Sequence, residues 1–235
     1  MKRLVIVALL LLVCVPQGFA RRKKAKAGKI ENGVFTDKEY GFQMTLPENW
    51  KTKTGDQKGH FRLTLVQKNY EVPPDYQDAP DYTQVPRIVV WADTTTLGAA
   101  AFIDSLVSNT FKSDQKKEVF KEFDLLNEAS AGSGTYRDPV VQKGRKTIKI
   151  DGAKGLRYSG RATYMKEVAL SASSTGGGKR VRGAYGGTVV ALKQGNTVVV
   201  FHMMCEWNYY KGIDQMMMNM VNALTWAGSD DESKS

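Results

Sequence analysis

The stretch formed by residues 188–226 constrains the fold most strongly, because two strand-like runs are followed directly by a helical pattern. Residues 188–192 and 197–201 read Thr-Val-Val-Ala-Leu and Thr-Val-Val-Val-Phe, a composition that suits strands buried on at least one face. The four residues between them are Lys-Gln-Gly-Asn, a turn sequence short enough for a hairpin. The segment therefore predicts a buried antiparallel hairpin that leads into a helix.

The apolar residues after position 212 predict one buried helix face. They recur at i, i+3, i+4, i+7, i+8 and i+11, as Ile213, Met216, Met217, Met220, Val221 and Leu224. Burying such side chains contributes roughly 1.5–3 kcal/mol each, but ordering the backbone costs about 1–2 kcal/mol per residue. The hairpin and helix therefore need a larger sheet to pack on. Because the methionines share this face with aliphatic residues, we interpret them as core packing rather than as a metal site.

The first 20 residues have the pattern of an export signal. Lys2 and Arg3 precede an unbroken apolar run at 4–15, and Ala20 ends a segment with small residues at the cleavage positions. The apolar run is shorter than the roughly 20 residues that span a bilayer. We expect a periplasmic or secreted protein with no transmembrane span after cleavage. An uncleaved signal and lipidation of Cys14 are the alternatives, although Val13 occupies the position where lipidation signals have a small residue.

A basic run follows the signal and accounts for most of the net charge. It begins with Arg21, Arg22, Lys23 and Lys24, which are candidate contacts to an anionic surface such as lipid headgroups. The alternative is a solvated leader, and we assign residues 21–35 to a basic disordered segment.

The charge of the remaining chain is close to zero. The full chain has a net charge of +10, and residues 30–235 contain 26 Lys/Arg and 24 Asp/Glu. A nucleic-acid-binding domain carries a basic excess on its folded part. We therefore expect no nucleic-acid partner.

Residues 36–227 are predicted to form a single domain of the α+β class. Strand patterns joined by short turns favour an antiparallel β-sheet flanked by α-helices. The expected strands are 42–46, 61–66, 88–92, 147–150, 155–163 and 181–192, ahead of the hairpin partner at 197–201. A first helix is expected after the N-cap candidates at 94–96, with the apolar stripe Phe102, Ile103, Leu106, Val107 and Phe111. Residues 116–128 fit either a strand or a helix.

The opening of this domain resembles a known family. Residues 40–50 read Tyr-Gly-Phe-Gln-Met-Thr-Leu-Pro-Glu-Asn-Trp, which is similar to the start of the PsbP/DcrB/Mog-type fold. The turn at Asp151-Gly152 and the final hairpin with its helix follow the same order over residues 36–226. The resemblance implies a PsbP/Mog-like α/β/α sandwich. Members of that superfamily are mostly non-enzymatic, and no functional residue carries over by position.

The residues that usually carry catalysis or bind metals are sparse. The chain has two histidines, His60 and His202, and one cysteine after the signal, Cys205, so no intramolecular disulfide can form. A zinc site from these three residues is the alternative to one surface and one core histidine with a buried thiol. Residues 176–179 read Gly-Gly-Gly-Lys but lack the spacing of a phosphate-binding loop, and we interpret 171–187 as a basic insertion. We predict no catalytic set, no metal and no cofactor.

The segment 70–87 is the candidate partner-binding loop. It contains Pro-Asp-Tyr twice, and prolines stiffen a loop while tyrosines present flat amphipathic faces. The contact candidates are Tyr76, Asp78, Tyr82 and Arg87. The alternatives are an irregular connection and a calcium site formed by the aspartates, which lack the spacing of an EF-hand.

These observations favour an exported, non-catalytic interaction module of the cell envelope that binds an envelope protein or an anionic surface. The competing hypotheses are a small-ligand carrier with a pocket between sheet and helix, and an enzyme whose site is assembled from distant residues. The polar tail at 228–235 is predicted to be disordered. Nothing in the sequence sets the oligomeric state.

Overall fold

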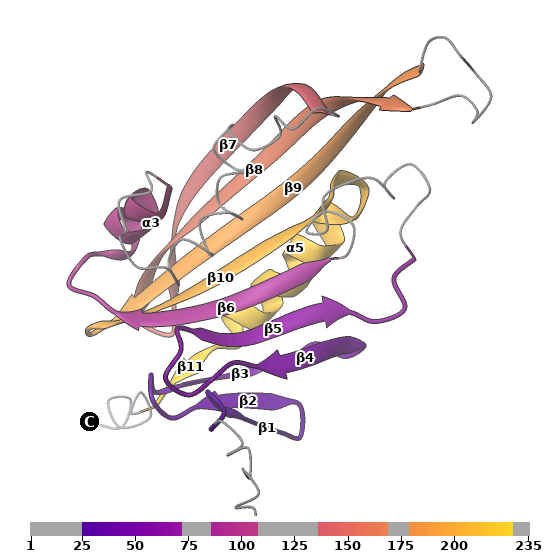
Figure 1. Cartoon of the computed structure of the whole chain (residues 1–235). Coiled ribbons are helices and arrows are strands. Elements are labelled where there is room, and N and C mark those ends of the chain that lie inside the picture. Colours follow the sequence, from indigo (N-terminus) through magenta and orange to yellow (C-terminus); the bar gives the residue numbers. More distant parts are fainter. Residues whose placement is uncertain (1–24, 72–85, 108–135, 169–178, 228–235) are drawn as a thin grey trace, which may run out of the picture.

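The fold is given by a computed structural model, which describes residues 25–71, 86–107, 136–168 and 179–227 (Figure 1). The described residues form strands and two helices. The strands are β1 (Lys29–Glu31), β2 (Val34–Asp37), β3 (Phe42–Thr45), β4 (Trp50–Thr54), β5 (Phe61–Gln67), β6 (Arg87–Thr94), β7 (Tyr136–Ile150), β8 (Ala153–Val168), β9 (Lys179–Gln194), β10 (Thr197–Glu206) and β11 (Thr225–Trp226); the helices are α3 (Ala99–Val107) and α5 (Trp207–Asn222).

The strands form two antiparallel sheets. The larger has seven strands in the order β4-β5-β6-β10-β9-β8-β7, and the smaller has four in the order β1-β2-β3-β11. Strands β7, β8 and β9 are the longest and extend beyond the rest of the sheet as a twisted ribbon (Figure 1). The predicted antiparallel α+β class is therefore confirmed, with a higher strand content than expected.

The C-terminal hairpin forms as predicted. Gln194 pairs with Thr197, and Gly195 opens the two-residue turn with a φ of +55°, a left-handed value that glycine adopts without strain. Strand β10 then lies between β9 and β6 in the sheet. Strand β9 starts at Lys179, so residues 179–187 belong to a strand and their assignment to an insertion was wrong.

The predicted turn at Asp151-Gly152 is also confirmed. Ile150 pairs with Ala153, and both turn residues have positive φ, +45° and +77°, as in the type I′ turns that suit the twist of a hairpin. Strand β7 before this turn begins at Tyr136 and is far longer than the four residues expected.

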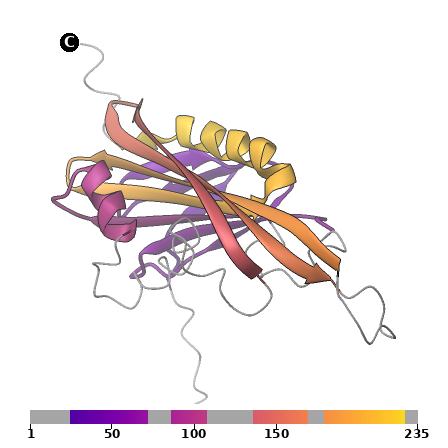
Figure 2. The same cartoon turned by 90° about the horizontal axis from the view of Figure 1, so that it is seen from above.

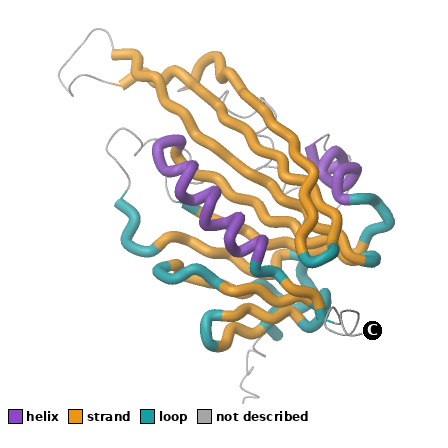
Figure 3. Tube along the Cα trace, turned by 180° about the vertical axis from the view of Figure 1, so that it is seen from behind, coloured by secondary structure: helices purple, strands orange, loops and turns teal. Residues whose placement is uncertain are grey.

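Helix α5 covers one face of the large sheet. Its residues Met217, Met220 and Val221 are buried against side chains of both sheets, among them Phe42, Leu65, Val90 and Phe201. Figure 3 shows α5 lying diagonally across the strands. The methionine stripe is therefore core packing, as predicted.

Helix α3 packs on the opposite face. Its Phe102 and Ile103 are buried in a second cluster with Trp91, Val189 and Val200. Seen from above, α5 and α3 lie on different sides of the strands (Figure 2). The sandwich expected from the resemblance is thus present in coarse form, since α3 has only nine residues and most of the fold is sheet.

The folded domain begins earlier than predicted. Residues 25–35 were expected to be disordered, but they include β1 and β2, and Phe35 is fully buried. Lys26 forms a β-bridge with Asp56, and the amide of Ala27 donates to the carbonyl of Gly55 at 2.9 Å. These contacts attach the N-terminal segment to the turn between β4 and β5.

Arg62 joins the two sheets. Its guanidinium lies in β5, is fully buried, and donates from Nε to Asp37 Oδ2 at 2.5 Å and from Nη2 to Glu39 Oε2 at 2.9 Å. It also lies 4.7 Å from the ring centroid of Tyr40, whose pKa is raised by burial. Asp37 ends β2, so this ion pair connects the small sheet to the large one.

Candidate anion-binding groove

Positive charge is concentrated in one part of the domain. Residues 136–194, which include β7, β8 and β9, contain 13 Lys/Arg and three Asp/Glu, whereas the rest of residues 30–235 contains 13 Lys/Arg and 21 Asp/Glu. The net charge of residues 30–235 is close to zero because a basic half with a charge of +10 is combined with an acidic remainder with a charge of −8. A field of this kind attracts anionic partners to the basic half.

An open groove lies in this basic half, beside the start of α5. Strand β8 places Arg157, Ser159 and Arg161 on the face that α5 covers, because alternate residues of a strand share a face. The groove has a volume of about 310 Å³. It is lined by Gly144, Arg157, Ser159, Gly160, Arg161, Trp207 and Tyr210.

The inner wall of the groove is formed by polar side chains that hydrogen-bond to one another. Arg157 Nη2 donates to both carboxylate oxygens of Asp214, at 2.9 and 2.7 Å. Thr188 Oγ1 donates to Asp214 Oδ1 at 2.7 Å and lies 2.7 Å from the hydroxyl of Tyr210. Burial by itself lowers the pKa of Arg157, but the hydrogen bond to Asp214 and the negative charge of Asp214 raise the pKa of Arg157 above its usual value. Arg157 is thus neutralised and held in place.

The outer wall carries the second arginine. The Arg161 guanidinium lies 4.4 Å from the ring centroid of Trp207, a cation–π contact. Trp207 in turn stacks on Tyr210, with centroids 4.9 Å apart and planes at 11°. Arg161 Nε is buried and has no hydrogen-bond partner among the described residues. A buried donor without an acceptor costs free energy.

Glycine in β9 lets the helix approach the sheet at this point. A Cβ on Gly186 would lie 2.4 Å from Tyr210 Cδ2 and 3.0 Å from Trp207 Cε3, closer than real Cβ atoms come to other atoms. The two stacked rings therefore rest directly on the backbone of β9. Their position fixes the width of the groove.

This arrangement suits the binding of a planar anion. An arginine stacked on an aromatic ring presents its N–H groups edge-on, in the geometry that accepts a carboxylate or phosphate in bidentate fashion. The neighbouring carboxylate, Asp214, is already bound by Arg157 and Thr188. The groove therefore offers one guanidinium without a carboxylate partner among the described residues.

Comparisons with known proteins agree on the fold only. No protein-family model matches the chain, and neither does any curated protein. Several solved structures are similar to it. PsbP of Synechocystis shares 9% identity at a TM-score of 0.45, with 85% of this chain and 96% of PsbP covered. The Ran-binding protein Mog1p of Saccharomyces cerevisiae shares 9% identity at 0.42, with 86% and 98% covered.

LpqN of Mycobacterium tuberculosis, described as involved in cell envelope biogenesis, shares 10% identity at a TM-score of 0.40, with 79% of this chain and 83% of LpqN covered. PsbP and Mog proteins are also the types that residues 40–50 resemble. At 9–10% identity the likeness assigns no site.

Most of the contact residues predicted from the sequence lie outside the described residues. This holds for Arg21, Arg22, Lys23 and Lys24 of the basic run, and for Tyr76, Asp78 and Tyr82 of the 70–87 loop. Arg87 is described, begins β6, and is half-buried. No described helix is both long enough and apolar enough to cross a membrane.

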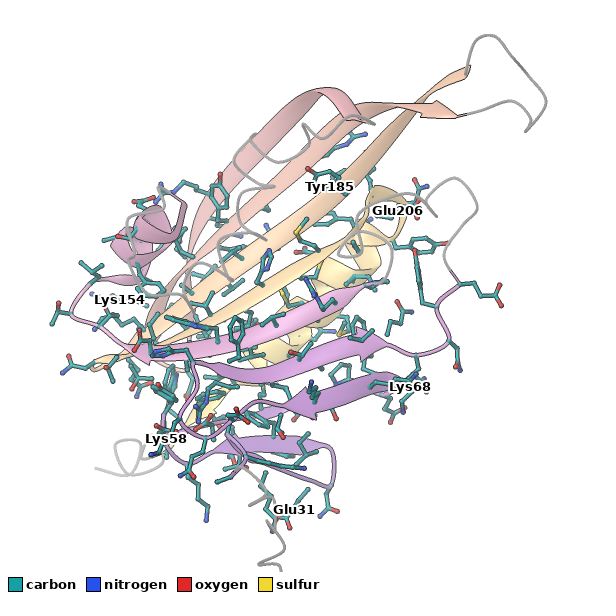
Figure 4. All side chains as sticks on the ribbon, viewed as in Figure 1. Glu31, Lys58, Lys68, Lys154, Tyr185 and Glu206 are labelled. Atoms are coloured by element: carbon teal, nitrogen blue, oxygen red, sulfur yellow. The ribbon has the colours of Figure 1, made fainter. Side chains whose placement is uncertain are left out.

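The described ends of the 70–87 loop lie near the start of α5. The Tyr70 hydroxyl donates to Glu206 Oε2 at 3.5 Å, and its ring contacts Tyr209 edge-on at 5.5 Å. Burial is the largest cause of the raised pKa of Tyr70, and the charge of Glu206 is the second largest. Figure 4 shows Glu206 next to Tyr185 at this end of the sheet, with Lys154 at the opposite end. Tyr209 is 46% exposed, so an aromatic surface borders the loop.

The three residues weighed as a zinc site do not form one. His60 is partly exposed beside Ala92 and Asp93, whereas His202 and Cys205 are buried. His202 and Cys205 differ by an odd number of residues along β10 and so lie on opposite faces of the sheet. No cluster of three metal-binding side chains occurs in the described part of the chain. Burial raises the pKa of the Cys205 thiol to about 12, so it stays protonated at neutral pH.

The burial of His202 predicts a loss of stability in acid. Burial, aided by the charge of Arg87, lowers the pKa of His202 from 6.5 to about 3. Between these values the unfolded chain binds a proton that the folded chain does not. The free energy of unfolding should therefore fall as the pH drops below 6.5, by up to about 1.4 kcal/mol per pH unit from this residue.

Urea denaturation between pH 7 and pH 4.5 measures this slope. His202→Leu should flatten the slope relative to the unmodified protein. Parallel slopes for the unmodified protein and His202→Leu would show that His202 is not the residue responsible.

The groove residues were not identified from the sequence. In the sequence, Arg157 and Arg161 look like ordinary exposed strand residues, and nothing near Trp207 indicates a binding site. One signal was available: Gly186 and Gly187 interrupt an otherwise regular strand pattern, and glycine inside a strand indicates close approach by another segment.

Proposed function

We propose that this protein is a non-catalytic binding module that takes an anionic group of a partner protein into the groove between α5 and β8. The observation that carries the proposal is Arg161, which is stacked on Trp207 with a buried Nε that lacks an acceptor among the described residues. A carboxylate in the groove would accept hydrogen bonds from the part of the Arg161 guanidinium that lines it. The basic charge of residues 136–194 would guide it there.

The predicted export signal at residues 1–20 supports a location in the cell envelope, where the partner would be an envelope protein. The geometry of the groove favours this hypothesis over a small-ligand carrier, because a carrier encloses its ligand in an apolar cavity and this groove is open and cationic. It also favours binding over catalysis, since the carboxylate of Asp214 accepts hydrogen bonds from Arg157 and Thr188.

Removing Arg161 should weaken anion binding. A charge-assisted hydrogen bond contributes about 1.5–3 kcal/mol, so Arg161→Ala should raise the Kd for a carboxylate probe by about 10- to 100-fold. The probe is the capped dipeptide acetyl-Glu-Glu-amide. Binding is followed through Trp207, the half-exposed tryptophan, since Trp50, Trp91 and Trp226 are buried, using its indole N–H signal in NMR spectra.

Arg145→Ala is the matched control. It removes the same charge from the same hairpin, but Arg145 is on the other face and pairs with Asp104 of α3 at 2.6 Å. This variant should bind the probe as the unmodified protein does. Equal weakening in both variants would mean that general charge, not the groove, binds the probe, and absence of binding to the unmodified protein would contradict the proposed function.

A further inference from the structure

Among the described strands, β7 is the outer edge of the large sheet on its basic side. It pairs with β8 along its length and is the last strand in the sheet order. The side chains of residues 144–150 are exposed or half-buried. An edge strand presents unpaired N–H and C=O groups, to which an extended chain can add.

The charges on this edge determine which kind of strand can pair with it. Residues 144–150 contain Arg145, Lys146 and Lys149 and no acidic residue. Pairing of two copies through β7 would place like charges opposite one another, which destabilises a sheet. The edge is therefore protected against a second copy of itself and complementary to an acidic strand.

The edge and the groove are continuous. Gly144 of β7 lines the groove and pairs with Ser159 of β8. Because Gly144 has no side chain, nothing on β7 at that position separates the edge from Ser159, and Arg161 lies two residues further along β8, opposite Gln142. Neighbouring strands lie about 4.8 Å apart, so a strand added to β7 would run roughly 10 Å from β8, a gap that a glutamate and an arginine side chain can bridge together.

We propose that the partner supplies an acidic, extended segment that adds to β7 as an eighth strand along residues 144–150. One carboxylate of this segment crosses Gly144 to reach Arg161, and another faces Lys146, which is on the same side of β7. The inference rests on the proposed function and makes it specific, since it names the conformation and the charge of the bound segment.

A synthetic strand tests the proposal. The probe is acetyl-Thr-Glu-Val-Glu-Val-Glu-Thr-amide, added to the full chain and followed by NMR and by amide hydrogen exchange. Two control peptides accompany it: one with N-methyl groups at alternate residues, which keeps the charge but removes main-chain donors, and one with Lys in place of Glu. We expect the acidic peptide to bind, N-methylation to weaken binding at least 10-fold, and the Lys peptide not to bind.

Variants on the two edges of the sheet locate the interaction. Lys146→Glu should weaken binding of the acidic peptide at least 10-fold, whereas Lys51→Glu on β4, the opposite edge, should leave it unchanged. Amide exchange at residues 144–150 should slow when the peptide is present, and exchange in β4 should not.

The outcomes separate this inference from the proposed function. If the acidic peptide and its N-methylated form bind equally and Arg161→Ala abolishes both, the groove binds anions but strand addition is wrong. A further outcome is that heparin or vesicles with anionic lipid displace the acidic peptide fully while N-methylation has no effect on binding. In that case the site recognises only negative charge, and strand addition is again wrong. If neither the peptide nor acetyl-Glu-Glu-amide binds, both proposals fail, and the edge charges serve only to prevent self-association.

Discussion

Replacing Arg62 by Ala is expected to lower the free energy of unfolding by about 3–5 kcal/mol, the cost of removing one partner of a buried ion pair. Asp37 has no exposed side-chain surface. Without Arg62 its carboxylate would remain buried without a cation. The loss should be visible as a lower midpoint in urea denaturation with an unchanged m-value.

The size of this effect follows from how completely Arg62 is bonded. Beyond Asp37 and Glu39, its Nη1 donates to the carbonyls of Gln57 and Gly59, and its Nη2 donates to the carbonyl of Ala27 at 2.9 Å. The side chain therefore holds together β2, the turn before β5 and the N-terminal segment. Its removal loosens three separate parts of the chain.

Arg145→Ala provides the comparison for a surface pair. Its bridge to Asp104 joins two side chains that are about half exposed, and exposed pairs contribute at most about 1 kcal/mol. An Arg62→Ala variant no less stable than Arg145→Ala would show that the buried pair does not hold the sheets together.

The parts of the fold that follow from local periodicity were predictable. The hairpin at 188–201, the turn at Asp151-Gly152 and the helix with Met217 and Met220 each depend on residues close in sequence. The spacing of their apolar residues follows from burial on one face, and this spacing is visible in the sequence.

Only residues 147–150 of the edge strand β7 were predicted, and the rest of β7 and the N-terminal segment were not predictable in the same way. Residues 144–150 are exposed or half-buried, so β7 shows no strong alternation of apolar and polar residues. Residues 25–35 are ordered largely by Arg62 and by the turn near Asp56, which follow them by 20 residues or more. A prediction based on residues close together in the sequence cannot detect such contacts.

The groove depends on a crossing of distant segments. Arg161 and Trp207 are far apart in sequence and meet because α5 starts directly after β10 and runs back over β9. Only the pairing of β8 with β9, with Arg161 opposite Gly186, puts the guanidinium under the first turn of the helix. Register of this kind is a property of the assembled sheet.

The second large effect concerns α3. Phe102→Ala should lower the free energy of unfolding by about 3–5 kcal/mol, the cost of deleting a buried aromatic side chain. Phe102 is fully buried, and its ring lies 5.4 Å from that of Trp91. A nine-residue helix is too short to be stable alone, so α3 depends on packing through Phe102 and Ile103. Urea denaturation followed by tryptophan fluorescence measures the loss.

Asp104→Ala on the same helix separates packing from surface charge. Asp104 is exposed and forms an ion pair with Arg145, so its removal should cost about 1 kcal/mol or less. A small loss for Phe102→Ala, close to that of Asp104→Ala, would mean that α3 does not cover a cooperative core. A large loss would instead show that both faces of the sheet unfold together, since Trp91, Val189 and Val200 lie on the α3 side of the same strands that pack against α5.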